Sequence, residues 1–164
     1  MGTKRLTRMA ILTAVALTIF IVELQLPNLT PIPGVKLGLA NIITVYAMFV
    51  LGGVDTLCIL IARILLGSIF SGQMMALFYS LAGGLLCYLV MLVLRRLFTP
   101  KQIWICSVLG AVAHNLGQMA VAVLITRTPA LLYYLPVLMI SGIIAGAFTG
   151  LCAQFVVNKM SRLK

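Results

Sequence analysis

The sequence predicts an all-α integral membrane protein, a bundle of six transmembrane helices with both chain ends in the cytoplasm. Of the 164 residues, 63% are hydrophobic and only 9% are charged, whereas about a quarter of the residues in a soluble domain are charged. The mean hydropathy is +1.20, which is also typical of a membrane protein. The length fits one domain, and we assign it to residues 1–164.

Six apolar segments are candidates for the spans. A membrane-crossing helix needs about 20 mostly apolar residues, with a range of about 17–25. The candidates are residues 9–26, 37–53, 56–71, 74–97, 103–125 and 130–157. The first follows a basic start but lacks a convincing cleavage site, so we expect a retained helix and not a signal peptide. The second and third are at or below the lower limit, and we expect them to be tilted, bent or partly re-entrant.

The basic residues set the orientation. Nine of the twelve lie before the first segment, between the fourth and fifth, or after the sixth: Lys4, Arg5, Arg8, Arg95, Arg96, Lys101, Lys159, Arg162 and Lys164. With six spans these three sites fall on one side of the membrane, and an excess of Lys and Arg marks the cytoplasmic side. The formal charge of +10 therefore indicates loops beside anionic lipid, and we expect no nucleic-acid partner.

Polar side chains interrupt three of the segments. Polar groups are costly inside a membrane, so they usually face a cavity or a partner. The second segment contains Asn41 and the third contains Arg63. The fifth contains His114, Asn115 and Gln118, whose i+3 and i+4 spacings place them on neighbouring positions of one helix face. Two interpretations stay open for the fifth segment, an interhelical hydrogen-bond network or the polar lining of a ligand pocket.

Arg63 requires an acceptor, because a guanidinium stays protonated even when it is buried. Glu23, carbonyls at a helix break and an anionic ligand are all candidates, and pairing with Glu23 competes equally with ligand binding. Asp55 is about 12 Å away along a helix, too far for contact. A Pro- and Gly-rich loop at residues 27–36 precedes the second segment. We predict a pocket between this loop and segments two, three and five, for a ligand with an anionic or strongly accepting part. Its polar residues would be Lys36, Asn41, Arg63, His114, Asn115 and Gln118.

Two segments carry small residues at four-residue spacing, which allows close approach of helices in lipid. The sixth segment carries Gly142, Gly146 and Gly150. We expect packing within the bundle there, with docking of another subunit as the alternative. The first segment carries Ala10 and Ala14, continued by Thr18, near its cytoplasmic end. This stripe is a candidate docking face for a partner helix.

Several motifs of enzymes are missing from the sequence. It contains no GxxxxGK[ST] loop for ATP, no Ser-His-Asp pattern and no paired carboxylates. With only Glu23 and Asp55 as acids, it cannot build a Mg²⁺–diphosphate site from aspartates. The four cysteines lie far apart, and the single histidine has no second ligand at metal-binding spacing. We therefore expect no catalytic residue, no metal and no cofactor, and we do not expect an enzyme.

Two stretches carry a resemblance to a known family: PGVKLGLAN at residues 33–41 and GSIFSG at residues 67–72. Over nearly its whole length the chain resembles the membrane proteins called Gx transporters, also labelled heptaprenyl diphosphate synthase component I. That family is similar to the substrate-binding S components of energy-coupling factor transporters. Those proteins have six helices, a pocket that opens outward, and an AxxxA face on the first helix that docks a coupling subunit. Ala10 and Ala14 fall where that motif is expected.

The resemblance implies a function and leaves alternatives. The first is a subunit of the bacterial cytoplasmic membrane that captures a small vitamin-like or isoprenoid-like molecule, energised by separate ATPase and coupling subunits. The second is a membrane scaffold or electron-transfer partner of an extracytoplasmic flavoprotein. The third is a non-catalytic subunit of a prenyl diphosphate synthase, for which the aspartate-rich motifs are missing from this chain.

Overall fold

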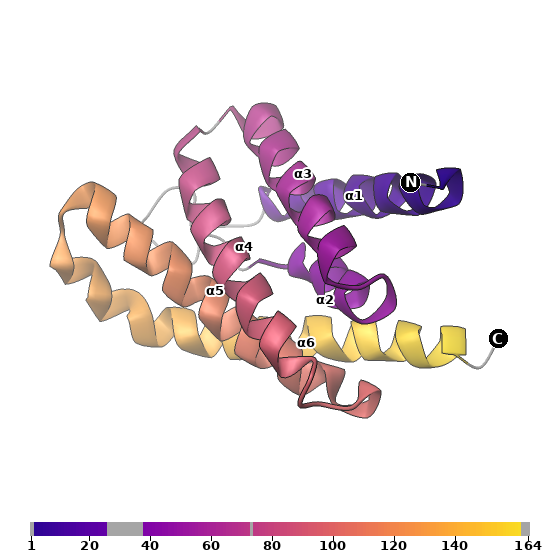
Figure 1. Cartoon of the computed structure of the whole chain (residues 1–164). Helices are drawn as coiled ribbons and strands as arrows, with labels where there is room; N and C mark the ends of the chain where they lie inside the picture. The colour runs from indigo at the N-terminus through magenta and orange to yellow at the C-terminus, as the bar shows by residue number, and fades with distance from the viewer. Residues whose placement is uncertain (1, 26–37, 73, 162–164) are drawn as a thin grey trace.

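The structure, a computed structural model, describes residues 2–25, 38–72 and 74–161, and this part of the chain is helical with no strand (Figure 1). The α-helices are α1 (Thr3–Glu23), α2 (Asn41–Val50), α3 (Gly53–Ser71), α4 (Met74–Leu94), α5 (Ile103–Thr126) and α6 (Leu135–Ser161). Short 3₁₀ helices, η1 (Pro100–Gln102) and η2 (Pro129–Tyr134), precede α5 and α6. The all-α prediction is confirmed.

Helix lengths distinguish five full spans from one short helix. α1, α3, α4, α5 and the segment of η2 with α6 are long and apolar enough to cross a membrane. The second predicted segment is helical only over the ten residues of α2, about 15 Å, or half of a hydrocarbon core about 30 Å thick. The third is longer than predicted, because α3 begins directly after Gly52. Gly52 has a φ of 101°, a conformation that favours glycine and lets the chain reverse between α2 and α3.

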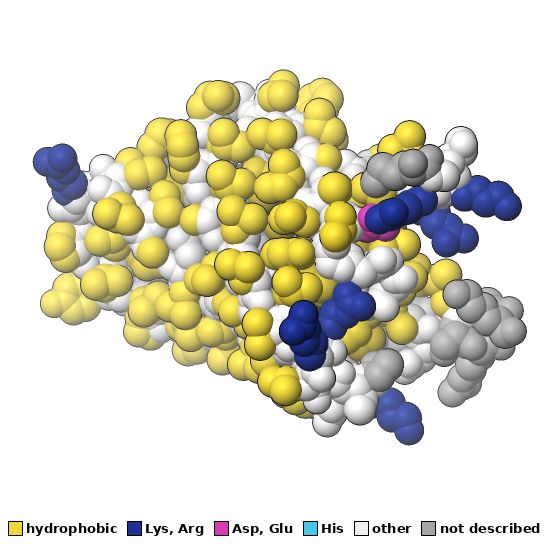
Figure 2. All heavy atoms as spheres, in the orientation of Figure 1, with side chains coloured by type: hydrophobic (Ala, Val, Ile, Leu, Met, Phe, Trp, Pro, Cys, Tyr) yellow, Lys and Arg dark blue, Asp and Glu magenta, His cyan; other side chains and the backbone are white. Residues whose placement is uncertain are grey.

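Both chain ends lie at the same end of the bundle (Figure 1). Most of the visible basic side chains gather at that end, and one lies at the opposite end (Figure 2). Arg5, near the start of α1, contacts the start of α3, and Arg95, after α4, lies 3.9 Å from the sulfur of Met48 in α2. Lys101 and Arg127 flank α5, whose 24 residues separate them by about 36 Å. This arrangement agrees with the orientation expected from the basic residues.

Close helix contacts at glycines hold α4, α5 and α6 together. A Cβ added at Gly146 of α6 would lie 2.8 Å from the Cα of Val108 in α5, and one at Gly150 would lie 2.6 Å from the Cα of Trp104. Gly117 of α5 approaches α4 equally closely, because a Cβ added there would lie 2.7 Å from the carbonyl oxygen of Ala82. The glycines of α6 therefore pack within the bundle, which confirms the first interpretation of their spacing.

One cluster of the apolar core lies between α2, α3, α4, α5 and α6 and includes Met48, Leu60, Met91 and Ile103, all at most 1% exposed. Many large apolar side chains instead face outward, and they cover most of the visible surface in Figure 2. Leu124 is 74% exposed and Ile69 is 69% exposed. Such an apolar exterior requires lipid as its surrounding, so the chain is a multi-pass membrane protein.

Candidate binding site

Five of the six predicted pocket residues are buried in the bundle. Their side chains are at most 5% exposed, and they are Asn41, Arg63, His114, Asn115 and Gln118. Lys36 lies outside the described residues. Buried polar groups normally find hydrogen-bond partners, so each of these side chains needs an explanation.

Gly38 brings the end of α1, the start of α2 and the middle of α5 together. Its φ is 77°, and an added Cβ would lie 2.8 Å from Asn41 Nδ2 and 3.3 Å from His114 Nε2. Its backbone N–H donates a hydrogen bond to Glu23 Oε1, with an N–O distance of 2.5 Å. A side chain at this position would separate these groups, so the close approach depends on glycine.

Arg63 lies in the middle of α3, and its side chain is only 5% exposed. The charge of Glu23 attracts its guanidinium, and His114 also lies within the range of its electrostatic field. This attraction is not an ion pair, because among the described residues the ion pair is the one between Arg5 and Asp55. Within the described part of the chain, Arg63 Nε and Nη2 have no hydrogen-bond partner.

His114 and Gln118 face α4. A Cβ added at Gly83 of α4 would lie 2.8 Å from Gln118 Cγ and 3.0 Å from His114 Nδ1. Side chains from four helices and a glycine of a fifth therefore meet in one region. We call the side chains of this region the polar cluster, defined as Glu23, Asn41, Arg63, His114 and Gln118.

Asn115 points to a different neighbour. Its Nδ2 donates a hydrogen bond to the carbonyl oxygen of Leu138 in α6, at 2.6 Å, and it lies against Gly142. For Asn115 the structure favours the interhelical hydrogen bond, because its amide joins α5 to α6. His114 and Gln118, one helical turn apart, lie instead in the polar cluster.

The polar cluster contains several buried atoms that lack hydrogen-bond partners among residues 2–25, 38–72 and 74–161. The donors are the two Arg63 nitrogens, and the acceptors are Asn41 Oδ1 and Gln118 Oε1. Leaving such an atom unpaired costs about 1–3 kcal/mol. A site with donors and acceptors side by side can hold a polar molecule. The described residues contain no group of three or more His, Cys, Asp or Glu side chains suited to a metal.

Two of the apolar grooves in the described part of the chain lie outside the polar cluster. One, of about 560 Å³, runs along α6 beside Leu39 and is lined by Val137, Ile140 and Phe148 among others. The second, which we call the inner groove, lies between α1, α2 and the end of α6, near the end where the basic residues gather. It has a volume of about 260 Å³, and its lining includes Arg8 and Tyr46. None of the five described pocket residues lines either groove.

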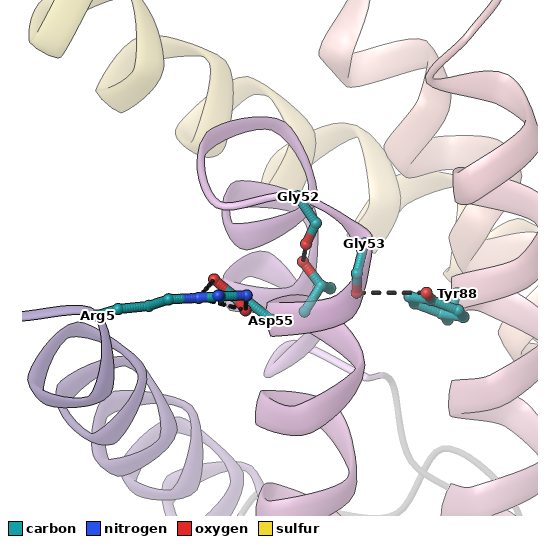
Figure 3. A network of polar contacts seen from close by, with 6 residues as sticks. Arg5, Gly52, Gly53, Asp55 and Tyr88 are labelled. Atoms are coloured by element: carbon teal, nitrogen blue, oxygen red, sulfur yellow. Dashed lines mark hydrogen bonds and ion pairs between the residues drawn. The ribbon is translucent and has the colours of Figure 1, made fainter. Parts of the chain in front are cut away.

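Sequence reasoning missed one ion pair. Arg5 Nε donates to both oxygens of Asp55, at 3.0 and 2.9 Å, and Arg5 Nη2 also donates to Oδ1 (Figure 3). Beside it, Tyr88 donates a hydrogen bond to the carbonyl oxygen of Gly53 at 3.3 Å. The pair joins the start of α1 to the start of α3, where an acidic side chain also suits the helix dipole. The sequence offered one signal for this pair. Asp55 is one of only two acids, so few acidic partners were available to the basic residues.

The fold and the polar cluster define a multi-pass α-helical membrane protein with a buried polar site. The chain belongs to the family described as heptaprenyl diphosphate synthase component I, whose family model matches residues 12–156. This match confirms the resemblance to the heptaprenyl diphosphate synthase component I family that the sequence indicated. No curated protein and no solved structure matches the chain.

Proposed function

We propose that this chain captures a small vitamin-like or isoprenoid-like molecule for uptake across the bacterial cytoplasmic membrane. The observation that supports this function is the polar cluster, in which buried donors and acceptors from several helices lack partners within the described residues. Ligand pockets are typically apolar with a few convergent polar groups, and polar groups inside a membrane commonly mark substrate sites.

The position of the polar cluster suits capture from outside. Glu23 ends α1 and Asn41 begins α2, so both lie away from the end where the basic residues gather. With that basic end in the cytoplasm, the polar cluster belongs to the outward half of the bundle. Unusually short or interrupted helices commonly accompany the binding sites of transporters, and α2 is such a short helix.

Uptake against a gradient needs an energy source, and the sequence has no ATP-binding loop. We propose that separate ATPase subunits supply the energy through a coupling subunit that docks on α1. Ala10, Ala14 and Thr18 are exposed, and the inner groove adjoins the same half of α1. Small exposed residues favour close docking of a helix in lipid, where hydrophobicity gives little driving force.

Native mass spectrometry of the purified protein in lipid nanodiscs tests the capture function. We expect one small molecule to remain bound to the wild-type chain and to be lost in Asn41→Ala, which removes a polar group of the cluster. Arg8→Ala, a change outside the cluster, serves as the matched control and should retain the molecule. If Asn41→Ala, Arg63→Ala and His114→Ala all retain it with unchanged affinity, the site lies elsewhere.

Co-purification with the coupling subunit tests the docking face. Ala10→Trp and Ala14→Trp should block assembly by steric exclusion while ligand binding by the isolated chain survives. Leu124→Trp, a change of an exposed residue on α5, is the control and should assemble normally. Normal assembly of both alanine variants would contradict the docking proposal and would favour a membrane scaffold for an extracytoplasmic flavoprotein.

The family description favours a second candidate, a non-catalytic subunit of a prenyl diphosphate synthase. The two acids of this chain cannot supply the aspartate-rich motifs of such enzymes, so a soluble partner would have to carry the chemistry. This candidate predicts that mixing the chain with a soluble, aspartate-rich subunit produces synthase activity that neither shows alone. The capture function predicts no such activity.

A further inference from the structure

We propose that the polar cluster recognises an organic acid, by binding a carboxylate or phosphate group side-on to Arg63. This inference rests on the proposed capture function and names the class of molecule that is captured. The rest of the molecule would carry N–H or O–H groups for the amide oxygens of the polar cluster.

The two Arg63 nitrogens without partners in the described part of the chain are Nε and Nη2. These two atoms form one edge of the guanidinium, and their N–H bonds point in nearly parallel directions. That edge matches the two oxygens of a carboxylate or a phosphate, which it binds in a bidentate manner. An edge of this kind that is buried and unpaired is the arrangement expected of a receptor for an oxyanion.

Arg5 shows how the same edge binds an oxyanion in this chain. Its Nε and Nη2 both donate to the carboxylate of Asp55 (Figure 3). The Arg5 side chain is 50% exposed, whereas Arg63 is 5% exposed. Because lower polarity strengthens charge-assisted hydrogen bonds, an oxyanion at Arg63 would be held more strongly than one at a water-exposed arginine.

Glu23 balances the charge of Arg63 without filling this edge. Its Oε1 accepts the hydrogen bond from the Gly38 backbone N–H, and its charge attracts the Arg63 guanidinium. A bound oxyanion would therefore sit near a second negative charge. Removal of that charge should strengthen binding of an acid, whereas it should weaken binding of a cation.

The other unpaired atoms restrict the molecule further. Asn41 Oδ1 and Gln118 Oε1 accept hydrogen bonds but cannot donate them, and neither has a partner among the described residues. An oxyanion alone would satisfy Arg63 and leave both amide oxygens unpaired. An acid that also carries hydroxyl or N–H groups would satisfy all three side chains.

The test identifies the charge of the bound molecule. The full-length protein is purified in nanodiscs and denatured, and released compounds are separated by anion exchange and identified by mass spectrometry. We expect an acid at about one equivalent from the wild-type chain. Arg63→Gln should lose it, and Arg8→Gln, a matched change of an exposed arginine, should keep it. Arg63→Lys keeps the charge but lacks the bidentate edge, so it should bind at least about tenfold more weakly.

Thermal stability provides a second measurement on protein washed free of bound molecules. The probes are inorganic phosphate and the monocarboxylates from acetate to octanoate, which separate a phosphate site from a carboxylate site. A probe that stabilises the wild-type chain should not stabilise Arg63→Gln. Glu23→Gln should bind the same probe about tenfold more tightly, because the second negative charge is gone.

The outcomes separate this inference from the capture function. Release of a neutral or cationic molecule that depends on Arg63 would overturn the oxyanion and leave capture intact. Retention of an acid in both Arg63→Gln and Arg63→Lys would also overturn it, as would weaker probe binding in Glu23→Gln protein whose circular dichroism shows the wild-type helical content. If the wild-type chain releases no molecule and responds to no probe, capture itself is wrong.

Discussion

Glu23→Gln should destabilise the protein substantially, because it leaves the charge of Arg63 buried without a nearby carboxylate. Both side chains are 5% exposed, so water cannot replace the lost attraction. In the described part of the chain the two charges attract each other through space without forming an ion pair, so we expect a loss of about 1–3 kcal/mol of unfolding free energy, less than for a broken buried ion pair. Glutamine retains a side-chain oxygen for the hydrogen bond from the Gly38 N–H, so the change removes mainly the charge.

A double-mutant cycle isolates the interaction between the two charges. Arg63→Gln alone should also destabilise the protein, since it leaves Glu23 without the attraction. The double variant should be less destabilised than the sum of the single changes, with a coupling energy of about 1–3 kcal/mol. Arg8→Gln combined with Glu23→Gln is the control, and its effects should add, because Arg8 lies about 22 Å along α1 from Glu23.

The assay is reversible unfolding in mixed micelles by titration with sodium dodecyl sulfate, followed by circular dichroism. The unfolding free energies of the four proteins give the coupling energy directly. A coupling below about 0.5 kcal/mol would refute the argument, because effects of independent sites add within that margin. Arg63 and Glu23 would then act separately, and the attraction between them would not contribute to folding.

Three further predictions follow from other contacts. Gly117→Ala should lower the unfolding free energy by about 1–3 kcal/mol, because its Cβ would meet the backbone of α4. Gly67→Ala is the control, because its Cβ would meet only an aromatic ring. An equally large loss of unfolding free energy in Gly67→Ala would contradict this prediction. Asp55→Ala should speed amide hydrogen exchange in the first turns of α1, since it removes the ion pair that holds them; unchanged exchange would count against that role. In a cysteine-free background, cysteines at Lys101 and Arg127 should label from opposite sides of the membrane, and labelling from one side would contradict the six-crossing topology.

The sequence predicted the spans well where length and charge decide the structure. A run of about 20 apolar residues must form its backbone hydrogen bonds internally in lipid, so a helix follows directly from composition. The second segment was predicted too long, because hydropathy does not detect backbone conformation. Gly38 and Gly52 both have positive φ, and the helix between them is limited to Asn41–Val50.

The site was predictable as a set of buried polar residues but not as a geometry. Each of the five described candidates is buried, as polar residues within apolar spans should be. The spacing along α5 grouped Asn115 with His114 and Gln118. Successive residues on a helix differ by about 100° in direction, however, and Asn115 faces α6. Contacts between distant segments, such as Gly38 with Glu23 and Arg5 with Asp55, depend on tertiary packing that no local pattern encodes.

The two buried or half-buried arginines differ in how completely their guanidinium groups are paired. At the basic end, Arg5 uses its Nε and Nη2 edge to bind Asp55, and the resulting contact fixes α1 against α3. Deeper in the bundle, the same edge of Arg63 has no partner among the described residues, and Glu23 Oε1 accepts from the Gly38 N–H. Two acids serve two buried or half-buried arginines, and only one of those arginines is fully paired. A chain that needed Arg63 solely for stability would gain from pairing it as completely as Arg5, so the open edge favours recognition of a ligand.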